Sequence, residues 1–586
     1  MSALWHGRGA RRLIAAALAT LAFSLVFSAQ KDQGVVRDEV VYMAHGSKYA
    51  DWWLAFISGT DGMVSEQAIT KHFGGPSPTS NNREHPPLMK TLFGLSHRLF
   101  YKSLRWTDEL SAYRLPSVAM NALLIALIFL FCADLFGTGV GFIAALCTLF
   151  LPRALFHAGL ACFDASVVTM WMAALIAYHR AVRWRGSFIT AGVVFGLALA
   201  TKHNALMLPA VVGVHYLYLA GYSQREALLE APGLRAKFLA LWRGFWRVRP
   251  SVILSLAVIG PLVFIALWPW LWFDTIDHIG DWVRFHLEHV HYNFEYLGEN
   301  LNSSPYPWHV PIVTTLFTVP VAVLLAAVCG AGAHIRTLID RRRDPDSPGD
   351  PSSAVILLLG LSMLVAMGPF FIGRAPIFGA EKHWAPAIPA LCILAALGVT
   401  AAAELAIDRL RQLGVVRAER VRLAGILVSV ALAGLVIGAA VSETAAAQPY
   451  ALSHYNALAG GAPGGADLGM NRQFWGYSAR GVLPFLDARA SERDGPLLVY
   501  SHDASPTIGW YHRLGLLDPK VKDSGLEQSG VRKSRYAIVV HELHFNRHDY
   551  MIWDSYGTVQ PVFVLRFQGV PIVSVYARPG SSSSAQ

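Results

Sequence analysis

Charged residues and cysteines are scarce in this chain of 586 residues. Only 15% of the residues are charged, whereas 54% are hydrophobic, and the mean hydropathy is +0.39. Because soluble proteins carry about 25% charged residues, this balance excludes a soluble or disordered chain and indicates a membrane protein. All five cysteines lie in or beside apolar runs, so the sequence supports neither a disulfide framework nor a CxxC zinc site.

Apolar stretches of about 20 residues, the length that crosses a membrane as a helix, recur along most of the chain. About eleven qualify, at residues 11–29, 115–133, 139–157, 164–181, 187–201, 205–221, 251–272, 310–330, 353–372, 384–406 and 423–441. The stretch 187–201 is the shortest of them. The sequence therefore predicts an all-α polytopic membrane domain.

Arginine and lysine are distributed unevenly between the connections. They cluster in every second one, at 8–12, 180–185, 225–249, 336–343 and 409–422. Basic residues mark the cytoplasmic side of membrane proteins, so this asymmetry predicts a cytoplasmic N-terminus. The net charge of +10 is thus a topology signal, and nucleic-acid binding is not indicated. The first stretch also resembles a signal peptide, with Arg11 and Arg12 before it, and both interpretations stay open.

This orientation places three longer segments on the outer, periplasmic side: 30–114, 273–309 and 442–586. The first has the mixed aromatic and polar pattern of amphipathic helices on a bilayer surface. The last contains three short β-type runs, at 497–500, 536–540 and 562–565, separated by Gly, Pro and Asp. We expect a membrane domain over 1–441 and a small α/β domain over 442–586.

Ionisable residues that can carry chemistry lie in these outer segments or at the outer ends of spans. Asp38 and Glu39 directly follow the first span, and a carboxylate at such a rim can act as a general base or remain a solvated loop charge. His85 and Lys90 flank Pro86 and Pro87, which can present them to an anion or simply begin a helix.

The other candidates lie further along the chain on the same side of the membrane. Asp164 begins the fourth span, where an ionisable residue indicates function or a helix N-cap. Lys202 interrupts the apolar run between the fifth and sixth spans, and a lysine there suits a phosphate or an interfacial anchor. Arg374 and Lys382 precede the tenth span. The candidates therefore converge on one membrane face.

The order of these motifs resembles glycosyltransferase family 39. The matching elements are the carboxylate pair after the first span, His85-Pro86-Pro87-Leu88 with a nearby lysine, and Asp164 at the outer start of a later span. The segments 374–389, 449–461 and 474–476 resemble bacterial members. This family includes the dolichyl-phosphate-mannose protein mannosyltransferases and the aminoarabinose lipid A transferases, both of the GT-C membrane class.

The resemblance implies an inverting enzyme that transfers a sugar from a polyprenyl-phosphate donor to a lipid, glycan or protein acceptor. It places the active site on the periplasmic face of the bacterial inner membrane, among membrane lipids, and requires no metal or other cofactor. Asp38 matches the catalytic carboxylate, with Glu39 and Asp164 as supporting carboxylates. His85 matches a position near the donor phosphate. The cations Lys90, Lys202, Arg374 and Lys382 are then candidates to stabilise the charge that develops on the leaving phosphate.

Two further questions stay open from the sequence. His286, His289 and His291, with Glu288, can ligate zinc or belong to an aromatic, His-rich helix that covers the site. A transporter or a membrane scaffold are alternatives to an enzyme, although transporters place ionisable residues near the bilayer midplane. The sugar, the acceptor and the oligomeric state are not determined.

Overall fold

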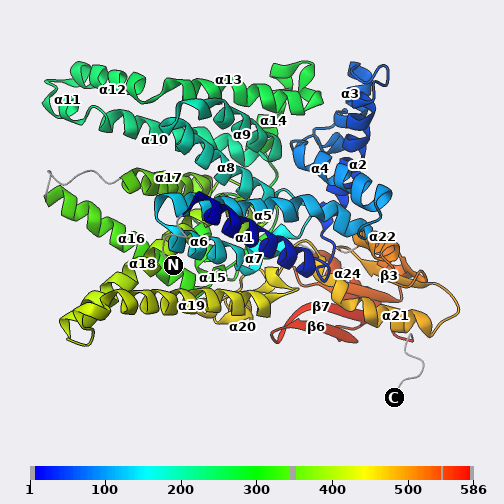
Figure 1. Ribbon diagram of the computed structural model, residues 1–586. Coiled ribbons are helices and arrows are strands. Elements are labelled where there is room, and N and C mark those ends of the chain that lie inside the picture. The colour runs from blue at the N-terminus through cyan, green and yellow to red at the C-terminus, as the bar shows by residue number, and fades with distance from the viewer. Residues whose placement is uncertain (1–6, 344–350, 504, 543–545, 581–586) are drawn as a thin grey trace.

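A computed structural model describes residues 7–343, 351–503, 505–542 and 546–580, and shows a large helical part joined to a five-stranded sheet (Figure 1). Within these ranges, nine helices are long and apolar enough to cross a membrane. They are α1 (Arg8–Ala29), α5 (Glu109–Leu135), α8 (Asp164–Arg183), α10 (Leu208–Tyr222) with the preceding 3-10 turn, α13 (Pro250–Leu267), α16 (Val321–Arg343), α17 (Pro351–Phe371), α18 (Ile388–Gln412) and α19 (Val421–Ala447). The predicted all-α membrane class is confirmed.

Two of the expected spans differ from straight membrane-crossing helices. The stretch 139–157 forms α6 (Thr138–Leu149) and α7 (Pro152–Ala158), which meet at 75°, with Pro152 at the start of the second helix. The stretch 187–201 forms α9 (Phe188–Thr201), whose 14 residues span about 21 Å at 1.5 Å per residue. That is shorter than the hydrocarbon core of about 30 Å. The described residues therefore contain nine candidate spans, or ten if the bent pair is one span.

The expected eighth span, 310–330, is also divided. It consists of α15 (Val310–Thr318) and the first part of α16. Pro320 lies between the two helices, and proline lacks the N–H that a continuous helix needs. The hydropathy of a stretch does not reveal such breaks.

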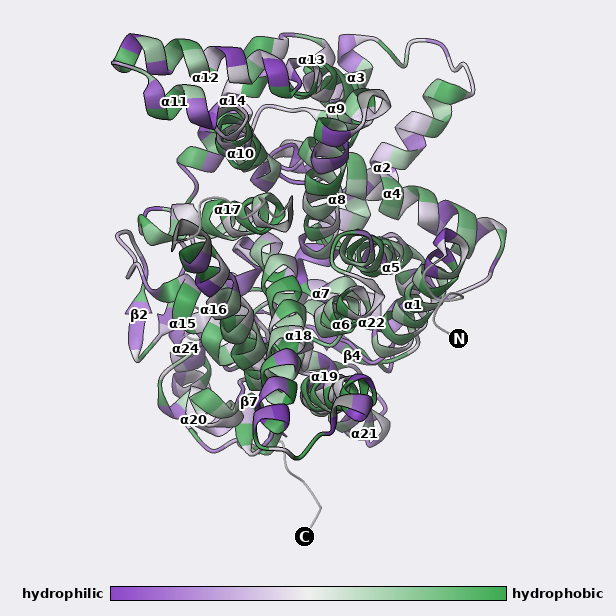
Figure 2. Cartoon of the chain, turned by 60° about the vertical axis from the view of Figure 1, so that its left-hand side comes forward, coloured by the Kyte–Doolittle hydropathy of each residue, from purple (hydrophilic) through white to green (hydrophobic). Residues whose placement is uncertain are grey.

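The first outer segment is helical, as its amphipathic pattern predicted. It contains α2 (Arg37–Ile57), α3 (Glu66–Phe73), α4 (Leu88–Ser96) and a π-helical turn at His97–Ser103. The second outer segment contains α14 (Thr275–Leu287) and an antiparallel hairpin of β1 (Phe294–Tyr296) and β2 (Glu299–Leu301). Two helices, α11 (Arg225–Glu230) and α12 (Leu234–Val248), connect α10 to α13. Figure 2 shows apolar residues along the long helices and hydrophilic residues gathered in connections such as the β1–β2 hairpin.

The three segments predicted on one side of the membrane contact one another. Arg37 forms an ion pair with Asp503 at 2.6 Å. The indole N–H of Trp282 donates to the carbonyl oxygen of Glu84 at 3.1 Å. The backbone amide of Asn471 donates to the carbonyl oxygen of Glu295 at 3.2 Å. Each contact joins a different pair of the three segments. They therefore lie together on one side, and the periplasmic assignment of that side stays a prediction.

The C-terminal part is an α/β domain, as predicted. Its strands are β3 (Leu497–Ser501), β4 (Val521–Asp523), β5 (Tyr536–Val540), β6 (Phe563–Phe567) and β7 (Val570–Ala577), in the spatial order β4-β3-β5-β7-β6. The first three are parallel, and β7 is antiparallel to β5 and β6. The helices are α20 (Gly461–Asp467), α21 (Leu483–Ser491), α22 (Ser505–Arg513), α23 (Glu527–Lys533) and α24 (Asn546–Tyr556). The β-type runs at 497, 536 and 562 are confirmed as strands, whereas β4 and β7 were not predicted.

One hydrophobic core joins this domain to the outer helices. Val36 and Met43 of the α2 region, Phe163 before α8, and Trp475 and Tyr511 of the C-terminal part belong to the same buried cluster. The sheet, coloured orange to red in Figure 1, accordingly lies at one end of the helical part, next to α22. The start of α2 is thus enclosed between the membrane helices and the C-terminal domain.

Candidate functional site

Glu39 is completely enclosed by hydrogen-bond donors. Its Oε1 accepts from Nε of Arg114 at 2.8 Å and from the amide of Ala161 at 2.7 Å. Its Oε2 accepts from Nη2 of Arg114 at 2.7 Å and from the amide of Val36 at 3.1 Å. Glu39 and Arg114 are both 0% exposed. This carboxylate therefore holds α2 against α5 and the loop before α8, and it has no surface for a substrate.

Asp38, the preceding residue, is only partly buried and has far fewer partners. The hydroxyl of Tyr42, one turn along α2, lies 3.5 Å from its Oδ2. The Tyr42 ring packs on Phe163 with 4.1 Å between ring centroids and meets the His85 ring edge-on at 5.7 Å. Burial raises the pKa of Tyr42, and the Asp38 carboxylate raises it further. The first turn of α2, the His85 loop and the start of α8 therefore meet at one place.

Asp164 and Lys202 form a buried ion pair at this place. The Nζ of Lys202 lies 2.7 Å from Oδ1 of Asp164, and the two residues are 6% and 5% exposed. Asp164 is the first residue of α8, and Lys202 directly follows α9. The pair thus joins two helices at the predicted rim, and each charge neutralises the other.

Lys382 is buried beside this pair without an acceptor of its own. Its Nζ lies 4.1 Å from the ring centroid of Trp475 and 4.9 Å from that of Phe378, and the residue is 5% exposed. No hydrogen bond or ion pair joins this ammonium to any other described residue. Burial lowers the pKa of Lys382, while the carboxylates of Asp38 and Asp164 act in the opposite direction. A buried cation without an anionic partner is unfavourable, so this position suits an anionic ligand.

A cavity among the membrane helices ends at these charges. At its polar end are Asp164 and Lys382 together with Arg153, His157 and Glu381. Most other lining residues are apolar, among them Leu124, Leu151, Val168, Val319, Ala385, Ile388 and Pro389. The cavity therefore combines an apolar interior with an ionic end, as a lipid with a charged head requires.

Arg153 and Glu381 were not predicted as site residues. Their ion pair measures 2.8 Å between Nη1 and Oε2, and Arg153 also donates to the carbonyl oxygen of His454 at 3.0 Å. The carboxylate of Glu381 has a lowered pKa despite its burial, because Arg153 lies beside it. The sequence signal for Arg153 was its place inside an apolar stretch, where an ionisable residue is costly.

Two predicted phosphate ligands lie outside this group. Lys90 is 0% exposed, and its ammonium donates to two oxygens of Asn82 at 2.5 and 3.1 Å, to the carbonyl oxygen of His85 at 2.9 Å and to Tyr49 at 3.3 Å. Burial lowers the pKa of Lys90 to about 7. Lys90 thus shapes the loop that presents His85. Arg374 is exposed and has no hydrogen bond or ion pair with the described part of the chain.

Arg37 connects the site to the C-terminal domain, a role that the sequence did not reveal. Besides its contact with Asp503, its Nη2 lies 3.6 Å from Oε1 of Glu542. Burial raises the pKa of Glu542 to about 8, and this residue lines a second, polar cavity. The other lining residues include Glu295, Glu299, Arg472, His541 and Asp549. Through Glu542, Arg37 at the start of α2 therefore contacts the rim of a polar cavity between the hairpin, α20 and the C-terminal sheet.

The histidines at 286, 289 and 291 do not form one group. His286 contacts the carbonyl oxygen of Glu84 at 2.9 Å, whereas His291 contacts the Tyr306 hydroxyl at 3.1 Å. Within the described ranges, the one group of three possible metal ligands consists of His85, His203 and His286. Of the two alternatives left open by the sequence, the described residues do not assemble the His286–His289–His291 trio, and α14 covers the His85 loop.

Comparison with known proteins supports the predicted resemblance over one segment. Residues 84–242 match the model of the family described as dolichyl-phosphate-mannose-protein mannosyltransferase. This confirms the family 39 resemblance for the part of the chain that contains His85, Lys90, Asp164 and Lys202. Asp38, Glu39, Arg374 and Lys382 lie outside the matched residues. No curated protein sequence matches the chain.

Among solved structures, the chain is similar to ArnT from Cupriavidus metallidurans. The apo form has a TM-score of 0.47 at 14% identity, and the form bound to undecaprenyl phosphate a TM-score of 0.45 at 14% identity; each alignment covers 98% of this chain and 99% of that chain. The Archaeoglobus fulgidus oligosaccharyltransferase, tethered to an acceptor peptide, is similar with a TM-score of 0.44 at 12% identity. That alignment covers 95% of this chain and 71% of the other.

Proposed function

We propose that this protein is a membrane glycosyltransferase that transfers a sugar from a polyprenyl-phosphate donor to an acceptor hydroxyl. The observation that carries this proposal is Lys382, a buried ammonium that forms no hydrogen bond or ion pair with the described residues, at the ionic end of an apolar cavity. A polyprenyl chain suits the apolar part, and its phosphate supplies the missing negative charge. The family match over 84–242 supports this class of donor.

The two neighbouring carboxylates take different parts in the proposed reaction. Asp38 orients the acceptor hydroxyl and accepts its proton, as a general base at hydrogen-bond distance does. The acceptor oxygen attacks the anomeric carbon, the bond between that carbon and the phosphate oxygen breaks, and polyprenyl phosphate leaves. Attack from the side opposite the phosphate inverts the anomeric configuration. Asp164 does not react in this scheme but holds Lys202 in place.

The leaving phosphate gains negative charge as the bond breaks, and fixed cations stabilise that charge. Lys382 is the first candidate because its ammonium has no hydrogen-bond acceptor among the described residues. Lys202 is partly neutralised by Asp164, and the His85 ring meets the ring of Tyr42, the residue that contacts Asp38, edge-on. The acceptor, a lipid, glycan or protein, enters through the polar cavity beside Glu542. The reaction takes place on the periplasmic face of the bacterial inner membrane.

A transporter is not favoured by this arrangement. The buried charges gather at one rim of the helical part and contact a folded outer domain, whereas transporter sites lie near the bilayer midplane at discontinuous helices. The test is direct. Purified protein with a short-chain polyprenyl-phosphate sugar and a hydroxyl acceptor should release polyprenyl phosphate. Movement of the intact lipid across vesicles without cleavage of the sugar–phosphate bond would instead show a transporter.

The proposed orientation is tested by labelling a single cysteine. Gln528 is exposed in the C-terminal domain, so Gln528→Cys in a background with Cys329→Ser should react with a membrane-impermeant reagent in intact spheroplasts. Cys329 is removed because it is the exposed member of the native cysteines. Labelling only after lysis would place the domain in the cytoplasm.

A further inference from the structure

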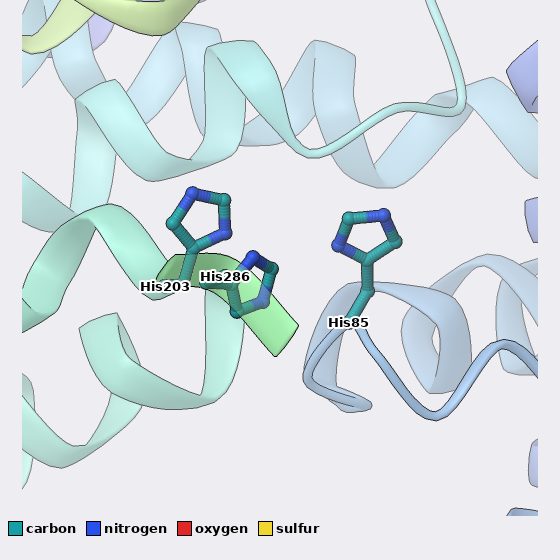
Figure 3. Close-up of side chains that lie close together, drawn as sticks. All are labelled: His85, His203 and His286. Atoms are coloured by element: carbon teal, nitrogen blue, oxygen red, sulfur yellow. The ribbon is translucent and has the colours of Figure 1, made fainter. Parts of the chain in front are cut away.

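Three histidines from distant parts of the chain converge (Figure 3), and one of them directly follows Lys202 of the Asp164–Lys202 pair. His85 lies in the loop before α4, His203 begins the short 3-10 turn that leads into α10, and His286 lies in the last turn of α14. One ring nitrogen from each can be chosen so that all three atoms lie within 4.8 Å of one another. Three imidazoles at this separation form the ligand set of a transition-metal site.

The hydrogen bonds around the rings leave nitrogen lone pairs free toward the group. The Nε2 of His286 lies 2.9 Å from the carbonyl oxygen of Glu84. Because a carbonyl oxygen only accepts hydrogen bonds, Nε2 carries the proton and Nδ1 is left as a ligand atom. This is the arrangement that orients metal-binding histidines, whose second nitrogen donates to a carbonyl or carboxylate.

The other two rings each have a buried nitrogen without a partner. Nδ1 of His85 and Nδ1 of His203 are inaccessible to solvent and form no hydrogen bond with the described residues. The rings are already close: His203 stacks on His286 with 3.8 Å between centroids, and His85 lies 6.0 Å from His286. Nitrogens that share one ion at 2.0–2.1 Å in a tetrahedral site are about 3.3 Å apart. Rotation of the side chains closes the remaining difference.

The surrounding charges are compatible with a cation. Lys202, which precedes His203, is neutralised by Asp164 at 2.7 Å. Glu84, which precedes His85, carries a carboxylate whose Oε1 accepts from Asn82 at 2.7 Å, while its Oε2 is buried without a partner. The lysine that precedes His203 is thus paired with a carboxylate and does not oppose the ion with an unpaired charge.

We propose that His85, His203 and His286 bind a zinc ion, with three imidazole nitrogens as protein ligands and the fourth position open to water or another ligand. Imidazole donors without a ring of oxygen ligands favour zinc over magnesium or calcium. The ion ties the His85 loop, the junction between α9 and α10, and α14 together. This inference does not depend on the reaction proposed above.

The experiment is to measure zinc in the purified, full-length protein. After treatment with a chelator, the protein is incubated with zinc chloride, dialysed, and analysed for bound metal by mass spectrometry; cobalt is used in parallel for its visible spectrum in a tetrahedral site. We expect one zinc per chain and no stable binding of magnesium. His203→Ala and His286→Ala should each weaken zinc binding by more than about 100-fold, beyond the 10–100-fold effect of losing a residue that only hydrogen-bonds to a ligand.

His289→Ala is the matched control. His289 follows α14, is half-buried like His286, and lies outside the group, so its removal should leave zinc binding unchanged. Loss of zinc in His289→Ala with retention in His203→Ala would assign the ion to the 286–291 segment and overturn the proposal. Folded wild-type protein that binds no stoichiometric zinc would also overturn it, and the rings would then be stacked neutral imidazoles only.

Zinc binding can also be tested if one of the histidine variants fails to fold. The wild-type protein itself provides a second measurement, since a ligand that binds only the folded state raises the unfolding temperature. Zinc should raise this temperature in the wild type and in His289→Ala. His203→Gln, which keeps a polar side chain at the position, should fold without this response. An equal zinc response in His203→Gln would contradict the proposed ligand set.

Discussion

Asp38 and Glu39 are neighbours on one helix, yet the structure gives them opposite environments. Glu39 receives four hydrogen bonds and is 0% exposed. Asp38 is partly exposed, and the hydroxyl of Tyr42 at 3.5 Å is its one hydrogen-bonding partner that the structure shows. A carboxylate whose oxygens are all occupied positions the backbone, whereas one with free lone pairs can take part in chemistry.

Two buried lysines repeat this difference. Lys90 donates to four acceptor atoms of three residues, while Lys382 lies against aromatic rings. A buried charged side chain whose hydrogen bonds are all made therefore indicates a structural role, and one without such bonds indicates a functional role. This criterion distinguishes the two roles more clearly than the position of the residue in the sequence does. Glu39 and Lys90 form a supporting region, and in the proposed function Asp38 and Lys382 form a reactive region.

Asp38→Asn should have the largest effect on turnover. Loss of a general base lowers the rate by roughly 10²–10⁴-fold, while donor binding and folding are preserved because the amide has nearly the same shape. Steady-state release of polyprenyl phosphate, together with equilibrium binding of the donor, measures both. A variant with wild-type turnover would remove Asp38 from the reactive region.

Glu39→Gln should act on stability instead of chemistry. It leaves the Arg114 guanidinium buried without its counter-charge, and breaking such a pair costs about 3–5 kcal/mol of folding free energy. Thermal unfolding in detergent checks this, with Glu66→Gln, at an exposed position in the first turn of α3, as the control. A stable Glu39→Gln protein without activity would place Glu39 among the reacting groups.

Lys382→Met should weaken both turnover and donor affinity. Methionine keeps the unbranched shape among the aromatic rings but removes the charge, so the expected loss is about 2–4 kcal/mol of transition-state stabilisation. Steady-state kinetics on a short-chain donor provides the measurement, with the exposed Lys102→Met as the control. Equal kinetic constants in both variants would show that the phosphate binds elsewhere.

Arg374→Ala should have the smallest effect, at most about 1 kcal/mol, because an exposed charge is screened by water. Its sequence motif predicted a phosphate ligand, and the same kinetic assay decides between the two expectations. A loss as large as that of Lys382→Met would mean that the segment around 374 closes over the donor when it binds.

The sequence predicted most of the candidate site residues but not which of them have a structural role and which a functional one. Asp38, Asp164, Lys202 and Lys382 were selected because each interrupts or flanks an apolar run, and His85 because it precedes the Pro86–Pro87 pair; the structure brings them to one rim. The same two rules also selected Glu39 and Lys90. The hydrogen bonds that occupy Glu39 and Lys90 are made with Arg114, Asn82 and backbone groups. No local sequence pattern shows that these groups lie close to the two residues. Arg37, Arg153 and Glu381 were missed because their partners come from remote segments.

By itself, the sequence determined the membrane class, the position of most spans, the outer helices and three strands of the C-terminal domain. These follow from local hydropathy and from charge asymmetry, which act over a few turns of the chain. Only the tertiary structure decided that α6 and α7 bend, that Lys382 has no acceptor in the part of the chain that the structure describes, and that His85, His203 and His286 converge. The reason is physical, because the desolvation and pairing of a charge depend on groups that are near in space and far apart in the chain.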